Sequence, residues 1–362
     1  MLEMLNHPND HKQEAPIMSQ CIIPEEYSSS INPADVLQDD NARGKPRPWS
    51  LHKTEAEATA VALAWAGQNA LADRVGNCAD VLWFRHVDGR QQLQKGTFCR
   101  VRICPICQWR RSLKLGGQVR ACTEWIQARQ AAAGHQPYRF ALLTLTVPNV
   151  PAEALGATLS LFSKAWDRMS KRAEFKRAIR GYVRATEITY NQGRDDYHPH
   201  LHVLLLVPKS YFTSRIYITR ARWLDLWRDA TGNPDITQVW VSRTAKEAEN
   251  APEEAQNAVL GHAIAEVTKY TTKPSAYLRG GLNIDTQARV ITTLQQVCAG
   301  RRFVALGGLY RKAAQALALD DPETGDLVHC SDPLAGESDA GAELWPYTWY
   351  PGPRLYLASR RR

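Results

Sequence analysis

The alternation of apolar and polar residues predicts most of the regular structure in the middle of the chain. Segments rich in β-branched residues and alternating with period two predict strands at 139–147, 181–190, 200–207 and 237–242. Apolar residues at helical spacing predict helices at 152–178, 219–228 and 253–272. The resulting order is β-α-β-β-α-β followed by one more helix. This order predicts an α+β fold with the ferredoxin-like, split βαβ arrangement, an antiparallel sheet with helices on one face.

The two ends of the chain follow different patterns. Residues 1–50 are rich in proline and polar residues without a sustained period, which predicts a disordered tail. An alanine-rich helical stretch begins at Thr54, and a short β-like segment and a cysteine cluster come after it. After Asp320 the chain is acidic and rich in Gly and Pro. We therefore expect four parts: a disordered tail at 1–50, a helical and cysteine-rich region at 51–135, the main domain at 136–320 and a flexible tail at 321–362.

Composition indicates a globular protein with a substantial core. The chain has 362 residues, of which 44% are hydrophobic and 11 are Trp. It contains no apolar run of about 18 residues, so we expect no transmembrane helix and no membrane partner. The N-terminus lacks a basic flank followed by an apolar run, which predicts no signal peptide. The expected location is the cytoplasm, where thiols stay reduced.

The charge balance is basic and uneven. Lys and Arg number 45 against 37 Asp and Glu, a net charge of +8. One basic cluster lies between Lys164 and Arg184 and a second between Cys99 and Arg120. Each cluster alone could be a solvated helix face. Because two such clusters precede the histidine-rich segment, together they favour a surface that binds phosphates.

Four of the eight cysteines have the spacing of a metal site. The motif CRVRICPIC contains Cys99, Cys104 and Cys107, and Cys78 precedes it. A C-x2-C pair near two further cysteines is typical of tetrahedral Zn²⁺ held by thiolates. The alternatives are unrelated reduced thiols or a redox pair, but a redox pair is expected in a thioredoxin-like βαβ context that is missing here. We therefore expect a structural Zn²⁺.

Three histidines fall within the five residues HPHLH at 198–202, at the start of a predicted strand. Alternate strand residues share one face, so His198, His200 and His202 would lie on the same side. The preceding strand carries Glu187, which the turn at 191–196 would bring near them. We predict that His200, His202 and Glu187 bind a divalent ion, Mg²⁺ or Mn²⁺ if the substrate is a phosphate. The role of His198 stays open between metal and DNA contact.

The helix predicted at 253–272 carries a candidate nucleophile. Glu266, Tyr270 and Lys273 are spaced i, i+4 and i+7, which would place them on one side. A tyrosine can attack a phosphodiester and remain attached to one end, and a nearby glutamate can activate the water that resolves the product. The alternative is an amphipathic helix whose tyrosine packs in the core and whose glutamate pairs with lysine.

Taken in order, these motifs resemble those of rolling-circle replication initiators of small bacterial plasmids, the single-tyrosine branch of the HUH endonucleases. The resemblance covers roughly residues 75–315. FALLTLTVPN (140–149) is similar to the first motif, YHPHLHVLLLV (197–207) to the metal motif and EVTKYTTKPSAYL (266–278) to the nucleophile motif. CRVRICPICQWRR (99–111) resembles the cysteine-rich segment of these initiators.

The resemblance implies a reaction and its partners. It assigns Tyr270 as the nucleophile, Glu266 as the residue that helps to end the reaction and residues 136–320 as the nicking-joining domain. The expected substrate is plasmid double-strand origin DNA, single-stranded at the nick site. A 5′-phosphotyrosine bond would form, and the freed 3′-OH would prime synthesis by a host DNA polymerase working with a host helicase. The sequence leaves the oligomeric state open, a dimer included.

Two other functions fit parts of the same pattern. A mobilisation relaxase or single-strand transposase of the same superfamily would share the chemistry. In relaxases, however, the tyrosine often precedes the histidines, whereas Tyr270 follows them. A non-catalytic, zinc-dependent DNA-binding regulator would need neither Tyr270 nor His200.

Overall fold

The computed structural model has a mixed α+β fold built on two antiparallel sheets. The structure describes residues 25–27, 29–41, 44–87, 90–243, 253–269, 271–272, 274–278, 281–330 and 343–359. Contacts divide the chain into a smaller unit (1–54, 79–97 and 340–362) and a larger one (55–78 and 98–339). In the described parts of the chain, no helix is long and apolar enough to cross a membrane.

The smaller unit is built around a four-stranded antiparallel sheet. Its strand order is β2 (Arg90–Gly96), β1 (Val81–Val87), β8 (Leu344–Tyr350) and β9 (Leu355–Ala358). Two short 3-10 helices, η1 (Glu25–Tyr27) and η2 (Pro33–Asp35), precede Trp49, the first residue of α1 (Trp49–Trp65). The buried Trp49 ring contacts Phe84 and Tyr356 edge-on, with ring centroids 6.3 and 6.4 Å apart.

Both regions that were expected to be disordered or flexible tails contribute ordered residues to this unit. The region expected to be a flexible tail at 321–362 supplies β8 and β9, since aromatic residues alternate along 345–349 and Tyr347 and Trp349 are buried. Of the N-terminal region expected to be disordered, 29–41 is described and contributes the buried residues Val36 and Leu37.

The larger unit contains the predicted strands in one five-stranded sheet. Its strand order is β6 (Val239–Arg243), β3 (Arg139–Thr146), β5 (Asp196–Val207), β4 (Gly181–Asn191) and β7 (Val304–Gly308), and every neighbouring pair is antiparallel. β5 therefore lies between β3 and β4, which are consecutive strands joined through helices. The predicted order of elements is confirmed, and β7 adds an edge strand that the sequence pattern did not indicate.

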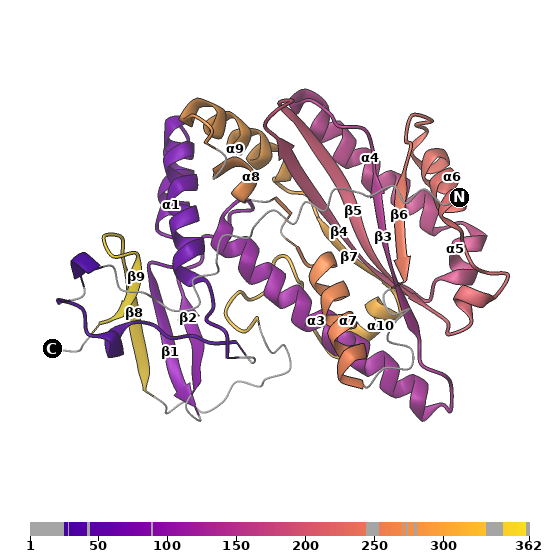
Figure 1. The fold of residues 1–362 in the computed structure, drawn as a ribbon, viewed down its shortest axis with the longest axis horizontal. Coiled ribbons are helices and arrows are strands. Elements are labelled where there is room, and N and C mark those ends of the chain that lie inside the picture. Colours follow the sequence, from indigo (N-terminus) through magenta and orange to yellow (C-terminus); the bar gives the residue numbers. More distant parts are fainter. Residues whose placement is uncertain are drawn as a thin grey trace, which may run out of the picture. The chain divides into compact units, whose positions relative to one another are not determined.

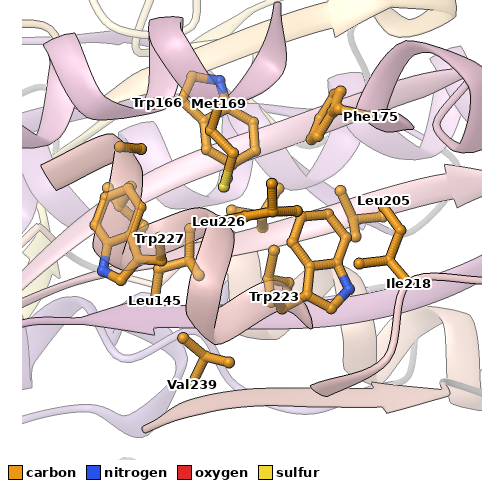
Figure 2. Packing of buried hydrophobic residues seen from close by; sticks show 14 of the residues in the cluster. Leu145, Trp166, Met169, Phe175, Leu205, Ile218, Trp223, Leu226, Trp227 and Val239 are labelled. Atoms are coloured by element: carbon orange, nitrogen blue, oxygen red, sulfur yellow. The ribbon is translucent and has the colours of Figure 1, made fainter. Parts of the chain in front are cut away.

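One face of this sheet is covered by α4 (Ala152–Ser170), α5 (Ala173–Ala178) and α6 (Arg220–Thr231). Leu201, Val203 and Leu205 point to this face from β5, because alternate residues of a strand share a side. Figure 2 shows three indole rings gathered over these strands, those of Trp166, Trp223 and Trp227. Burial of such large rings contributes much of the stability of this layer.

The opposite face is also covered, which corrects the expectation of helices on one face only. It is packed by α3 (Pro105–Ala132), α7 (Glu253–Val267) and α10 (Leu309–Ala316), which bury Leu204 and Leu206 of β5 (Figure 1). α3 starts at the cysteine motif and continues onto the sheet. The expected boundary near residue 135 therefore does not coincide with a division between the two compact units.

The remaining elements of the larger unit are α2 (Asn69–Gly76), η3 (Tyr211–Thr213), α8 (Pro274–Leu278) and α9 (Ile284–Cys298). The N-cap of α9 is Asn283, whose side chain accepts a hydrogen bond from the backbone N–H of Thr286.

Candidate active site

The β4–β5 hairpin brings Glu187, His200 and His202 together. Asn191 pairs with Asp196 across the turn, so counting four residues away from the turn on each strand places Glu187 opposite His200. His202 lies two residues further along β5 and points to the same side. This is the face covered by α3, α7 and α10, to which Val183 and Leu204 also point. The three predicted ligands thus converge at one end of a buried layer.

The ligand atoms fit a single divalent ion. Oε2 of Glu187 lies 3.0 Å from Nε2 of His200 and 2.8 Å from Nε2 of His202. Neighbouring ligands at about 2.1 Å from an octahedral ion are separated by about 3.0 Å. The Glu187 side chain is 3% exposed and the two histidine side chains 12% and 14%, so a carboxylate and two imidazoles share a largely dry site.

The tautomer of His200 supports the same conclusion. Its Nδ1 lies 3.2 Å from the carbonyl oxygen of His198, which can only accept, so Nδ1 donates the hydrogen. In the neutral imidazole Nε2 then carries a lone pair, and this lone pair faces a carboxylate oxygen. Two such groups repel each other unless a proton or a cation lies between them. The arrangement suits metal ligation with a backbone carbonyl orienting the ring.

His198 lies outside this ligand group. Its Nε2 contacts the hydroxyl of Thr146 on β3. Burial lowers the pKa of His198, which favours the neutral imidazole. Thr144, also on β3, lies opposite His202, with Oγ1 3.4 Å from Nδ1. The two threonines were not singled out from the sequence. Their alternation in LTLT was visible, but the pairing of β3 with β5 was not.

The expected helix over 253–272 is shorter in the structure, because α7 ends at Val267. Beyond it the backbone joins the sheet: the N–H of Ile188 donates to the carbonyl oxygen of Thr271 at 2.8 Å, and Thr272 forms a parallel bridge with Ile188. The β-branched residues in VTKYTTK have low helix propensity, which favours this exit. The prediction that this helix continues to residue 272 is therefore wrong.

Tyr270 and Lys273 themselves lie outside the described residues. Glu266 is described, and Oε2 of its carboxylate accepts from Nζ of Lys269 at 2.5 Å, as the packing alternative expects. Among the described residues Glu266 is not part of the ligand group of Glu187. The chain that follows Tyr270 nevertheless runs beside Glu187, because Ile188 is the next residue of β4.

The four predicted cysteines form a second cluster. The sulfurs of Cys78, Cys99, Cys104 and Cys107 all lie within 4.8 Å of one another. Sγ of Cys107 is 3.6 Å from that of Cys78 and 3.7 Å from that of Cys99. Sulfurs about 2.3 Å from a common tetrahedral ion are about 3.8 Å apart, so this spacing fits one metal ion.

Backbone groups support thiolates in this cluster. The N–H of Cys99 donates to Sγ of Cys78 at 3.4 Å, and the N–H of Arg100 donates to Sγ of Cys107 at 3.3 Å. Arg100 has a φ of 60°, a left-handed conformation typical of a tight turn. Contact with the neighbouring thiols, above all Cys104, lowers the pKa of Cys99, whereas burial raises the pKa of Cys104. A cation at the centre would allow all four to ionise.

Comparison with known proteins identifies the relatives of the chain. The model of a family described as "Replication protein" matches residues 90–357. A "Protein rep" of Bacillus amyloliquefaciens is 32% identical over 346 residues, covering 91% of this chain and 99% of the relative. A "Protein rep" of Streptococcus pneumoniae serotype 2 is 34% identical over 307 residues, covering 83% and 89%. One of Staphylococcus aureus is 40% identical over 190 residues, covering 52% and 75%. No solved structure matches the chain significantly.

Proposed function

Because the chain belongs to the family of replication proteins, we propose that it initiates rolling-circle replication of a plasmid by nicking one strand at the double-strand origin. One observation carries this proposal. The chain segment that follows Tyr270 is hydrogen-bonded to β4 directly beside Glu187, which shares its carboxylate with His200 and His202. The described residues that directly follow the candidate nucleophile therefore lie beside the candidate metal centre.

The sheet supports the corresponding fold assignment. The order β6-β3-β5-β4, with β5 between the helix-linked strands β3 and β4, is that of a split βαβ, ferredoxin-like sheet. We propose that this is an HUH endonuclease fold and that residues 136–320 contain the nicking-joining domain. α3 belongs with that domain, since its residues Leu115 and Val119 pack on the sheet.

The ligand sets suggest which ions the two sites hold. Glu187, His200 and His202 would bind Mg²⁺ or Mn²⁺, and the four-cysteine cluster would bind a structural Zn²⁺. Bound between its three ligands, the divalent ion would polarise a phosphoryl oxygen and offset the negative charge that develops during displacement.

The residues of the chain would carry out two steps. The phenolic oxygen of Tyr270 loses its proton and attacks the phosphorus, and the bond from phosphorus to the 3′ oxygen breaks. The 3′ oxygen takes up a proton and becomes the hydroxyl that primes synthesis, while the 5′ end stays on Tyr270. Lys273 supplies positive charge near the phenolate. After one round of synthesis, Glu266 removes a proton from the water that cleaves the phosphotyrosine bond.

The proposed partners follow from this chemistry. They are origin DNA, single-stranded at the nick site, a host helicase that unwinds the duplex and a host DNA polymerase that extends the 3′-OH. Phosphate contacts by the basic clusters would give affinity for any DNA, with selection of the origin added by base contacts.

The test is a nicking assay with the whole protein. Supercoiled plasmid carrying the origin is incubated with the protein and Mg²⁺ or Mn²⁺, and the products are separated on denaturing gels. Open circles with protein attached to the 5′ end are expected. Tight origin binding without any cleavage would reject the proposal in favour of a DNA-binding regulator.

A further inference from the structure

Gln108, on the first turn of α3, holds Thr272 through three hydrogen bonds. Oε1 of Gln108 accepts from the backbone N–H of Thr272 at 3.1 Å and from its hydroxyl at 3.1 Å. Nε2 of Gln108 donates to the same hydroxyl oxygen at 3.0 Å. Both residues are buried, Gln108 at 5% and Thr272 at 1% exposure. Unpaired polar groups are costly in such surroundings. These three hydrogen bonds therefore act as a Gln108–Thr272 clamp, which strongly favours one position of the segment 271–272.

The clamped segment is held from its other side by the sheet. The carbonyl oxygen of Thr271 accepts from the N–H of Ile188 on β4, and Ile188 directly follows Glu187. Gln108 in turn directly follows Cys107, a member of the cysteine cluster. A continuous set of contacts thus leads from that cluster through Gln108 and Thr272 to the strand that carries Glu187.

We propose that Gln108 is a positioning residue for the nicking reaction. It fixes Thr271 and Thr272, which follow the nucleophile, against β4 beside the metal ligands, and the cysteine cluster fixes the start of α3 from which Gln108 projects. This inference rests on the proposed nicking function. A displacement of the reacting groups by about 1 Å can slow a reaction on the order of 100-fold, so the clamp governs rate rather than DNA affinity.

The test compares variants that are nearly equal in volume. Gln108→Met removes all three hydrogen bonds, Thr272→Val removes the two that involve the hydroxyl, Thr272→Ser retains all three, and Gln118→Met is the matched control. Gln118 is a buried glutamine on the same helix, and its amide donates to Asp320 at 2.8 and 3.0 Å. The substrate is a labelled single-stranded oligonucleotide that spans the nick site. Its dissociation constant and its single-turnover cleavage rate are measured for each variant.

Gln108→Met and Thr272→Val should cleave on the order of 10–100-fold more slowly with unchanged affinity, whereas Thr272→Ser and Gln118→Met should cleave at the wild-type rate. Amide exchange at Ile188 and Thr272 should be faster in Gln108→Met than in Gln118→Met. Equal rates in Gln108→Met and Gln118→Met, or unchanged exchange, would overturn the positioning role. Failure of the wild-type protein to cleave would instead reject the nicking function, and the exchange experiment would still test the clamp.

A separate cavity points to a second DNA-binding site. It has a volume of about 720 Å³ and lies where β4 begins and where β5 and β6 end. Arg180, Lys209 and Arg243 line it together with Phe212, and none of the described residues in its wall is acidic. The guanidinium of Arg243 stacks 4.5 Å from the ring centroid of Phe212. From His200 to Val207 β5 spans seven residues, about 23 Å, so this cavity is far from the metal ligands.

We infer that this basic cavity binds the phosphate backbone of origin DNA outside the nick site. Lys and Arg neutralise phosphates without reading sequence, and each contact steepens the dependence of affinity on salt. The probe is origin duplex, titrated at several salt concentrations with an Arg180→Ala, Lys209→Ala double variant. The control is Arg311→Ala, Lys312→Ala, which removes the same charge from exposed positions on α10, outside both basic clusters.

Loss of two phosphate contacts should reduce the slope of log affinity against log salt by about 1.8, while cleavage of the short nick-site oligonucleotide stays unchanged. The control should retain the wild-type slope. An unchanged slope in the cavity variant, or an equal change in the control, would overturn this assignment. Because the slope is measured by binding alone, it is independent of whether the protein nicks.

Discussion

The backbone N–H of Ile188 donates a hydrogen bond to the carbonyl oxygen of Thr271 at 2.8 Å. This bond joins the segment after α7 to the strand that carries Glu187, across a large separation in sequence. This backbone hydrogen bond therefore holds the segment that follows the proposed nucleophile beside the proposed metal centre, independent of any bound ion.

Replacement of His200 or His202 by Ala should abolish the divalent site. Each change removes one of the two imidazoles that accompany the single carboxylate of Glu187. Mn²⁺ affinity and the nicking rate should therefore both fall by at least about 100-fold. Titration calorimetry with Mn²⁺ measures the first effect and the plasmid assay the second. His135→Ala, at an exposed position, is the control. Undiminished Mn²⁺ binding in both site variants would remove the metal assignment.

Replacement of Cys99 or Cys107 by Ser should release a structural metal. Elemental analysis of the purified protein should find zinc in the wild type and little in these variants, whose melting temperature should also fall because the ion stabilises the folded state. Cys122→Ala is the matched control, since Cys122 is buried on α3 away from the cluster. A similar loss of zinc in this control would argue against a dedicated four-cysteine site.

Glu266→Gln should separate nicking from release. Loss of the general base should leave cleavage intact but allow the covalent protein–DNA complex to accumulate. Lys269→Met is an informative control, because it breaks the same ion pair and keeps the carboxylate. The pair is partly exposed, so neither change should alter stability by more than about 1 kcal/mol. Normal turnover of the covalent complex in Glu266→Gln would exclude this role.

Cys122 and Cys298 should resist alkylation in the native protein. Burial raises the pKa of each thiol to about 12, so only about 1 in 10⁴ molecules carries the reactive thiolate at pH 8. Since both pKa values are raised on folding, this preference for the thiol destabilises the fold only above about pH 9. Mass spectrometry after iodoacetamide treatment should detect both residues modified only in denaturant. Rapid labelling of native protein would contradict their burial.

Local patterns predicted that Glu187, His200 and His202 lie together because the relevant contacts are local. The turn at 191–196 sets the hairpin register, and period-two alternation then places Glu187 against His200. The contacts of Thr271 and Thr272 could not be predicted this way, since they join segments distant in sequence. The register of β3 with β5, which brings Thr144 and Thr146 to the histidines, was hidden for the same reason.

Composition led to a wrong prediction for the C-terminal part of the chain. Acidic, Gly-rich composition after Asp320 suggested a flexible tail, although the aromatic alternation of LWPYTWY is that of a strand. The short alternating pattern was therefore a better predictor of structure here than the composition of the whole region. The error at the end of α7 has a different cause. Apolar residues at helical spacing predicted a helix to residue 272, whereas the β-branched residues of VTKYTT favour an extended backbone.

The most direct test of the central claim uses Tyr270→Phe, which removes only the attacking oxygen. Wild-type and variant protein are incubated with a 5′-labelled nick-site oligonucleotide and Mn²⁺, and any covalent adduct is digested and located by mass spectrometry. The account predicts an adduct on Tyr270 in the wild type and neither adduct nor cleavage in the variant. Cleavage by Tyr270→Phe, or an adduct on another residue, would contradict it.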